Sequence, residues 1–303
     1  MTSIKVIPPN KVEIWDSRKT LLGEGPFSTG KNNEVVTWVD ILGKSVLSKN
    51  FETGKQTEVS YDEVTSFSVP CRNGGSIVGL ASGPIFIDKN GKTHKLPTRE
   101  EANGIPDELP TRWNDAKASP QGDLFLGSMT YKADPGRGDL YRLEGDGSSM
   151  VKILSGVTIS NGLAWSNDGE TLFYIDTPTQ GIDAFSFDGK NISNRRRVWS
   201  TSEKYFGNPD GMTIDSAGNL WVAFWEGSCM RRINTNFEVD YEIQLPVRLV
   251  TSATFAGSDL KTLIITTSQG DLHYSDLSPE AGLTYAVEVD IPGVKTSLCT
   301  LDW

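Results

Sequence analysis

Apolar residues along this chain alternate with polar residues in short runs, which is the period of a β-strand. Asp, Asn and Gly residues that favour turns separate these runs, as between the hairpin partners Gly181–Asp188 and Arg195–Ser200. Helical periodicity is weak throughout, and Arg99–Pro110 is the best candidate for short helical or irregular structure. The pattern predicts an all-β chain of many short strands.

A repeat organises the predicted strands. Each copy begins with a polar residue, continues with apolar alternation and a turn, and then adds another apolar strand. Successive copies begin 42, 48, 47, 49 and 42 residues apart, at Glu24, Ser66, Asn114, Asn161, Asp210 and Ser252. A period of about 40 to 50 residues with this content matches one four-stranded blade of a propeller.

The six copies fill the chain and predict its architecture. We expect one domain over residues 1–303, an all-β six-bladed β-propeller with four antiparallel strands in each blade. The segment Lys11–Asp16 should pair with the C-terminal strands, because a closed ring leaves no exposed strand edge there.

Composition and charge narrow the function classes. The formal net charge is −10 and the pI is about 4.8, so nucleic-acid binding is disfavoured. Cys71, Cys229 and Cys299 lie far apart without metal-ligand spacing, which favours buried reduced thiols. Neither an apolar signal segment nor a run of about 18 apolar residues occurs. We expect a soluble, cytoplasmic protein with no nucleic-acid or membrane partner.

The six repeat starts should meet in space, because the innermost strand of every blade lines the central channel. All six are polar, and buried polar groups need partners. One interpretation is a ring of channel residues hydrogen-bonded to water. The other is a divalent metal, because Glu24 and Asp210 are carboxylates whose repulsion a cation relieves. The donors are all oxygens, which suits Ca²⁺, Mg²⁺ or Mn²⁺ better than a zinc site.

Several motifs are spread over most of the chain: Leu22–Phe27 (LGEGPF), Arg112–Asp115 (RWND) with Pro120 and Gly127–Met129 (GSM), Ile159–Trp165 (ISNGLAW) and Pro209–Asp215 (PDGMTID). In order and spacing they resemble those of the gluconolactonase, regucalcin and luciferin-regenerating enzyme family. The resemblance implies a six-bladed propeller lactonase with one divalent metal.

The resemblance also implies roles for individual residues. The family's metal ligands correspond to Glu24, Asn161 and Asp210, and the residues that hold its sugar lactone correspond to Arg112 and Asn114. We expect Ca²⁺, with Mg²⁺, Mn²⁺ or Zn²⁺ as alternatives. Relatives of regucalcin carry a longer stretch between the motif that corresponds to Gly127–Met129 and the next strand, and an acidic residue in that stretch contacts substrate. Here the stretch 130–137 is short, and Asp134 is the candidate replacement.

The lactone hydrolysis that the resemblance implies needs two effects that a divalent cation can supply. A divalent cation polarises a carbonyl and lowers the pKa of bound water. We predict that Asp210 is both a ligand and the catalytic base, and that Arg112 binds sugar hydroxyls or the developing oxyanion. His94 and His273 lie in strand or turn contexts without a nucleophile motif, so a surface role is favoured for both.

The predicted function is therefore hydrolysis of a small-molecule sugar lactone, of the gluconolactonase kind, with a divalent metal. Two alternatives remain open. The same site permits another lactone, an ester or an organophosphate as substrate. A calcium-binding propeller without turnover is the alternative outside the enzyme class.

Overall fold

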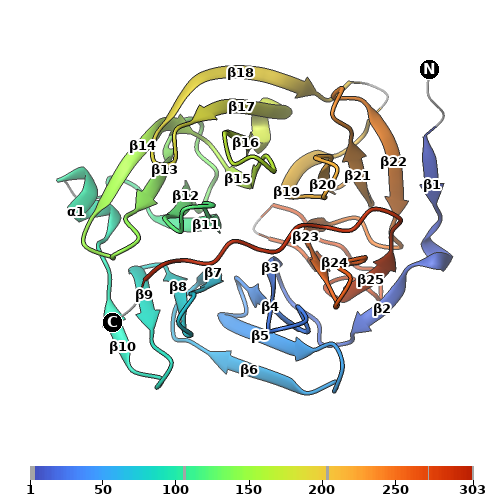
Figure 1. Cartoon of the computed structure of the whole chain (residues 1–303), viewed down its shortest axis with the longest axis horizontal. Coiled ribbons are helices and arrows are strands. Elements are labelled where there is room, and N and C mark those ends of the chain that lie inside the picture. The colour runs from blue at the N-terminus through green and yellow to red at the C-terminus, as the bar shows by residue number, and fades with distance from the viewer. Residues whose placement is uncertain (1–3, 105–106, 203–204, 272, 302–303) are drawn as a thin grey trace.

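The computed structural model of the chain is a ring of six β-sheets around a central channel (Figure 1). It describes residues 4–104, 107–202, 205–271 and 273–301. In each blade the four strands counted from the channel outward pair with their neighbours in antiparallel fashion. The predicted six-bladed β-propeller is thus confirmed.

Four blades follow the order of the chain directly. The first has β3 (Gly23–Thr29), β4 (Val35–Asp40), β5 (Ser45–Asn50) and β6 (Gln56–Ser60). The second has β7 (Thr65–Pro70), β8 (Ser76–Leu80), β9 (Gly83–Ile87) and β10 (Thr93–Lys95). The third has β11 (Thr111–Ala118), β12 (Leu124–Thr130), β13 (Gly138–Leu143) and β14 (Met150–Val157). The fourth has β15 (Ser160–Trp165), β16 (Thr171–Asp176), β17 (Gly181–Phe187) and β18 (Ile192–Ser200).

The last two blades combine strands from both ends of the chain. The fifth has β19 (Asn208–Ile214), β20 (Leu220–Trp225), β21 (Cys229–Ile233), β22 (Val239–Gln244) and β1 (Lys5–Ile7). The sixth has β23 (Val250–Ala256), β24 (Thr262–Thr267), β25 (Thr284–Glu288) and β2 (Glu13–Asp16).

The ring is closed as the sequence predicts, because β2 pairs antiparallel with β25 in the sixth blade. The strand β1 was not predicted. It runs parallel to β22 at the outer edge of the fifth blade, and its three residues are too few to show a period.

The segment 99–110 contains the short helix that we expected there, α1 (Arg99–Asn103). Thr98 and Glu101 cap its start reciprocally, side chain to backbone, and Gly104 ends it with φ 70°. Residues 105–106 of this segment lie outside the described residues. Two 3₁₀ turns complete the element list, η1 (Pro9–Lys11) and η2 (Thr177–Thr179).

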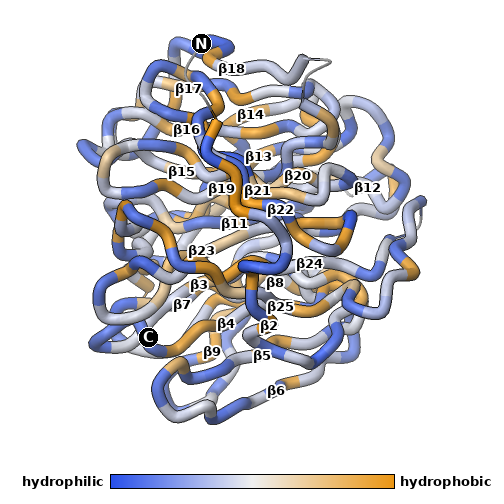
Figure 2. Tube along the Cα trace, turned by 90° about the vertical axis from the view of Figure 1, so that its right-hand side faces the viewer, coloured by the Kyte–Doolittle hydropathy of each residue, from blue (hydrophilic) through white to orange (hydrophobic). Residues whose placement is uncertain are grey.

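The core lies within and between the blades rather than at one centre. Trp38, Trp165 and Trp221 are buried at repeat positions, as are many of the apolar strand residues around them. Seen edge-on, apolar positions lie mainly along the strands while the projecting turns are mainly hydrophilic (Figure 2). All three cysteines are buried and free, as predicted. Within the part of the chain that the structure describes, no helix is long and apolar enough to cross a membrane.

Candidate functional site

Each inner strand carries one repeat start at an irregularity of its pairing. The register of β3 shifts between Glu24 and Phe27, and that of β11 shifts around Asn114. An extra residue of this kind bends the strand and turns a side chain away from the regular face. The remaining starts occupy similar irregularities on β7, β15, β19 and β23: Ser66, Asn161, Asp210 and Ser252.

The glycines after Asn161 and Asp210 let neighbouring blades approach closely. A Cβ atom on Gly162 would lie 2.7 Å from the backbone oxygen of Asp210, and one on Gly211 would lie 2.3 Å from Oγ of Ser252. Atoms do not pack at such distances, so only glycine fits either position. The Asn-Gly and Asp-Gly pairs therefore bring consecutive inner strands together.

A cavity of about 280 Å³ opens at this mouth of the channel. Its lining includes five of the six residues to which the sequence assigns a role: Glu24, Arg112, Asn114, Asn161 and Asp210. All five are buried, with 5 to 8% of their surface exposed. Four inner strands that are far apart in the sequence, β3, β11, β15 and β19, thus contribute polar groups to one small volume.

A chain of hydrogen bonds fixes the orientation of the amides. Nη1 of Arg112 donates to Oδ1 of Asn114 over 2.7 Å. Nδ2 of Asn114 donates to the backbone oxygen of Ser160 over 2.8 Å and to Oδ1 of Asn161 over 3.3 Å. Nδ2 of Asn161 donates in turn to Oγ1 of Thr177 over 2.9 Å. Because its nitrogen is committed to Thr177, Asn161 presents its oxygen as an acceptor.

Two buried carboxylates dominate the electrostatics of the cavity. Burial, and after it the charge of Asp115, raises the pKa of Glu24 to about 8. Burial also raises the pKa of Asp210 well above its usual range, with Glu24 and Asp115 adding to the effect. A hydrogen bond from the backbone N–H of Gly25 to Glu24 Oε2, 2.9 Å long, opposes these effects only in part. The folded chain therefore holds negative charge here at a free-energy cost.

Arg112 and Lys117 are the cations that flank these carboxylates. Burial lowers the pKa of Arg112, while Glu24 and Asp210 act in the opposite direction. Only Nη1 of Arg112 donates to a described residue, so its Nε and Nη2 remain available to a ligand. On the inner side, Lys117 interacts with Asp115, whose pKa is raised by burial.

The donor set fits a hard divalent cation. Glu24, Asn161 and Asp210 supply only oxygen atoms, and two of them are carboxylates whose repulsion such a cation relieves. No cluster of three or more His, Cys, Asp or Glu with metal-site geometry occurs among the described residues. The candidate site is therefore of the mixed carboxylate and amide kind.

Three other residues singled out in the sequence lie elsewhere. Asp134 does not line the cavity, and its Oδ2 accepts a hydrogen bond of 2.7 Å from Thr130 within its own turn. Ser66 donates to the backbone oxygen of Trp113 over 2.6 Å, which satisfies its hydroxyl inside the ring. His94 lies 3.3 Å from Asp88 at the outer edge of the second blade.

Sequence reasoning missed one wall of the cavity. Met129, Ile159, Trp225, Asp271 and Tyr274 all line it. The rings of Trp225 and Tyr274 meet edge to face, with centroids 5.8 Å apart. Asp271 and Tyr274 belong to a turn after β24 that occupies no repeat slot, so the period could not place them. Gly270, whose φ of 150° suits glycine, was the one local signal of that turn.

Fold and cavity together define a six-bladed propeller with an acidic and amide-rich site at one mouth of its channel. Residues 22–269 match the family model described as the SMP-30/gluconolactonase/LRE-like region. The chain belongs to this family, so the resemblance noted in the sequence is confirmed.

Individual relatives match over nearly the whole chain. Regucalcin of Gallus gallus is 35% identical, over 91% of this chain and 94% of its own. Pentonolactonase XacC of Haloferax volcanii is 32% identical over 82% of each chain. Among solved structures, luciferin-regenerating enzyme superposes with a TM-score of 0.87 at 28% identity, covering 96% of this chain and 99% of its own.

Proposed function

We propose that this protein hydrolyses a sugar lactone with the help of one divalent cation held by Glu24, Asn161 and Asp210. The observation that carries the proposal is the convergence of these three residues with Arg112 and Asn114 in one buried cavity. Membership of a family that includes a named pentonolactonase supports the reaction class. A volume of about 280 Å³ suits a small substrate.

Each residue has a distinct task in this proposal. The cation, when bound, supplies polarisation of the lactone carbonyl and of the attacking water. Asp210 accepts the proton that the water loses, because its carboxylate belongs to the lining of the cavity that would hold the water and the cation. Arg112 offers Nε and Nη2 to the sugar hydroxyls or the developing oxyanion of the substrate, while Nη1 stays bound to Asn114. Asn114 thereby holds the guanidinium in place.

The proposed cation is Ca²⁺, because the ligands are uncharged or carboxylate oxygens and no nitrogen or sulfur donor is among them. The three buried free thiols support the cytoplasmic location that we propose. The substrate is a small molecule, which agrees with the size of the cavity.

A panel of five- and six-membered sugar lactones tests the proposal. Hydrolysis releases an acid, so a pH indicator follows the rate with purified protein before chelation, after chelation and after each cation is restored. We expect activity that chelation abolishes and Ca²⁺, Mg²⁺, Mn²⁺ or Zn²⁺ restores. Absence of lactone turnover with every cation would leave a calcium-binding propeller, and turnover confined to aryl esters or organophosphates would change the substrate class.

Two variants separate the tasks assigned to Asp210. Asp210→Ala removes a ligand charge and the base together, so turnover should fall by about a hundredfold or more. Asp210→Asn keeps an oxygen ligand but cannot take the proton. If Asp210 is the base, Asp210→Asn stays slow at saturating metal. Recovery of the wild-type rate under those conditions would assign Asp210 to metal binding alone.

A further inference from the structure

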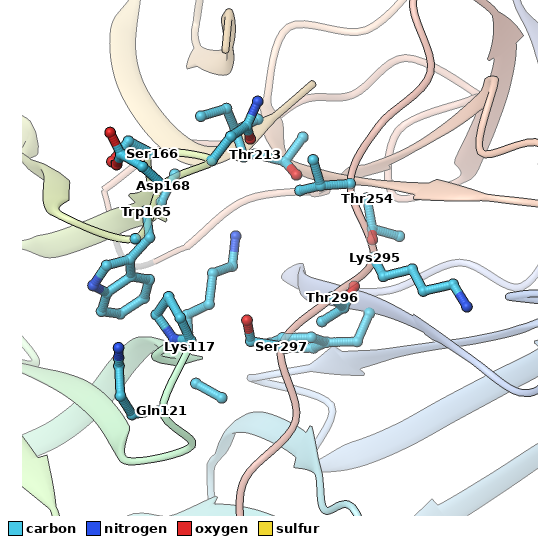
Figure 3. A pocket seen from close by; sticks show the side chains of 18 of the residues that line it. Lys117, Gln121, Trp165, Ser166, Asp168, Thr213, Thr254, Lys295, Thr296 and Ser297 are labelled. Carbon is cyan, nitrogen blue, oxygen red and sulfur yellow. The ribbon is translucent and has the colours of Figure 1, made fainter. Parts of the chain in front are cut away.

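A second cavity, of about 310 Å³, lies at the opposite end of the channel from the candidate site (Figure 3). The inner strands that supply the first site also supply its wall, three residues further on. Asn114 is followed by Lys117 on β11, and Asp210 is followed by Thr213 on β19. Since a strand rises about 3.3 Å per residue, the two sets lie about 10 Å apart along the channel.

One side of this cavity is formed by the segment 294–298, which we call the strap. It crosses the ring near the C-terminus, in red in Figure 1. Backbone hydrogen bonds hold it at both ends, from Gly293 N–H to the oxygen of Leu260 over 2.8 Å and from Cys299 N–H to that of Pro70 over 3.0 Å. Between these points no strap group makes a hydrogen bond to any residue that the structure describes. Its polar groups therefore lack protein partners.

Lys117 projects into the cavity from β11 (Figure 3). Its ammonium donates to the backbone oxygen of Met212 over 2.7 Å, which uses one of its three N–H groups. Burial lowers the pKa of Lys117, and Asp115 on the channel side acts in the opposite direction. A second acceptor on the cavity side would stabilise this half-buried charge.

Hydroxyl groups surround the ammonium. Thr213, Thr254, Thr296 and Ser297 line the cavity, and none of their side-chain hydroxyls forms a hydrogen bond with a described residue. One carboxylate belongs to the lining, that of Asp168, and its Oδ1 already accepts from Ser166 and from the N–H of Glu170. The cavity thus offers an ammonium with two uncommitted N–H groups and hydroxyls that can donate, beside a carboxylate that is already hydrogen-bonded.

We propose that this cavity binds a small oxyanion, a carboxylate or a phosphate group, between the Lys117 ammonium and the hydroxyls of the strap. The unused N–H groups of the ammonium and the hydroxyls can donate to the oxygens of such a ligand, and the cation selects a negative charge. Hydroxyl groups on such a ligand would pair with Thr213 and Thr254 on the opposite wall. The proposal does not depend on lactone hydrolysis, because no residue of the first site takes part.

Isothermal titration calorimetry of the full chain tests this site, with gluconate and inorganic phosphate as probes and sorbitol as the neutral counterpart of gluconate. We expect heat from an oxyanion and none from sorbitol. The anion that binds more tightly then shows whether the site takes a carboxylate or a phosphate group. Equal binding of sorbitol and gluconate, or no binding of either anion at millimolar concentration, would overturn the proposal.

Variants locate the binding. Lys117→Gln keeps a donor for Met212 but loses the charge, so affinity should fall about tenfold or more. Lys55→Gln is the matched control, because Lys55 is exposed and does not line the cavity. Asp210→Asn, at the other mouth, should also bind normally. Unchanged affinity in Lys117→Gln, or loss of binding confined to Asp210→Asn, would refute the assignment.

A strap variant keeps the test decisive if Lys117→Gln does not fold. The double substitution Thr296→Val with Ser297→Ala removes two hydroxyls that have no protein partner, so the fold should be unaffected. Anion affinity should fall several-fold. Full affinity in this folded variant would show that the strap hydroxyls do not bind the ligand and would contradict the proposal.

Discussion

Replacing Glu24 by Gln should stabilise the metal-free protein at alkaline pH. The pKa of Glu24 is raised from 4.5 to about 8, first by burial and then by Asp115. Between these values the unfolded chain releases a proton that the folded chain keeps, so the free energy of unfolding falls as pH rises through this window. One pKa unit corresponds to ~1.4 kcal/mol, and the whole shift therefore corresponds to ~5 kcal/mol.

Gln is neutral and nearly the same shape, and its oxygen can still accept from the N–H of Gly25. The chelated wild type should lose up to ~5 kcal/mol through Glu24 between pH 5 and pH 9. The chelated variant lacks this contribution and should lose less stability over the same range, because only the raised pKa of Asp210 remains. Adding Ca²⁺ should reverse the order at high pH. The wild type then gains stability by mass action, and the variant, which has lost a ligand charge, gains less.

Thermal melting followed by circular dichroism measures this crossover, with chelator or with Ca²⁺ at each pH. Glu58→Gln is the matched control, because Glu58 is exposed on β6. It should follow the wild type under all conditions. A melting temperature of chelated wild type that does not change with pH, or a chelated Glu24→Gln protein that never exceeds it at high pH, would refute the reasoning.

Other predictions address binding, specificity and folding. At neutral pH the chelated wild type should melt at a higher temperature once Ca²⁺, Mg²⁺, Mn²⁺ or Zn²⁺ is added, and an unchanged melting curve with all four would count against a metal site. Arg112→Lys keeps the charge but loses the planar set of N–H donors of the guanidinium, so it should mainly raise the KM for lactone. A loss confined to kcat would give Arg112 a different role. Trp221→Ala should destabilise the fold by ~3–5 kcal/mol in urea denaturation, because Trp221 is fully buried and its Nε1–H donates to Asp215 over 3.0 Å. A loss below ~1 kcal/mol would contradict the packing described for it.

The fold could be predicted because a propeller repeats its own signal. Each copy places a polar residue and a following strand at the same interval, so the sequence contains the evidence six times. The pairing of β2 could be predicted as well. The C-terminal part of the chain supplies only three strands of the sixth blade, so an N-terminal strand has to supply the fourth. The strand β1 has no counterpart in the repeat, and its three residues are too few to give a periodic pattern.

The site residues that could be predicted are likewise those that belong to the repeat. Glu24, Asn114, Asn161 and Asp210 occupy repeat slots, so their convergence follows from the fold. Trp225, Asp271 and Tyr274 lie on a strand end and in a turn, where position depends on local geometry rather than on period. Asp134 shows that closeness to a motif in the sequence does not by itself place a side chain in the cavity. Its place near a motif suggested a contact with substrate, but its carboxylate is hydrogen-bonded to Thr130 in a turn beside the cavity.

The position of a bound cation tests the central claim most directly. Crystals of the protein grown with Mn²⁺ would give anomalous scattering that locates the metal without any assumption about the reaction. We predict one strong peak at the channel mouth, coordinated by Glu24, Asn161 and Asp210, and no such peak in crystals of Asp210→Ala. A channel mouth without a peak at saturating Mn²⁺, or a peak held by other residues, would contradict the account.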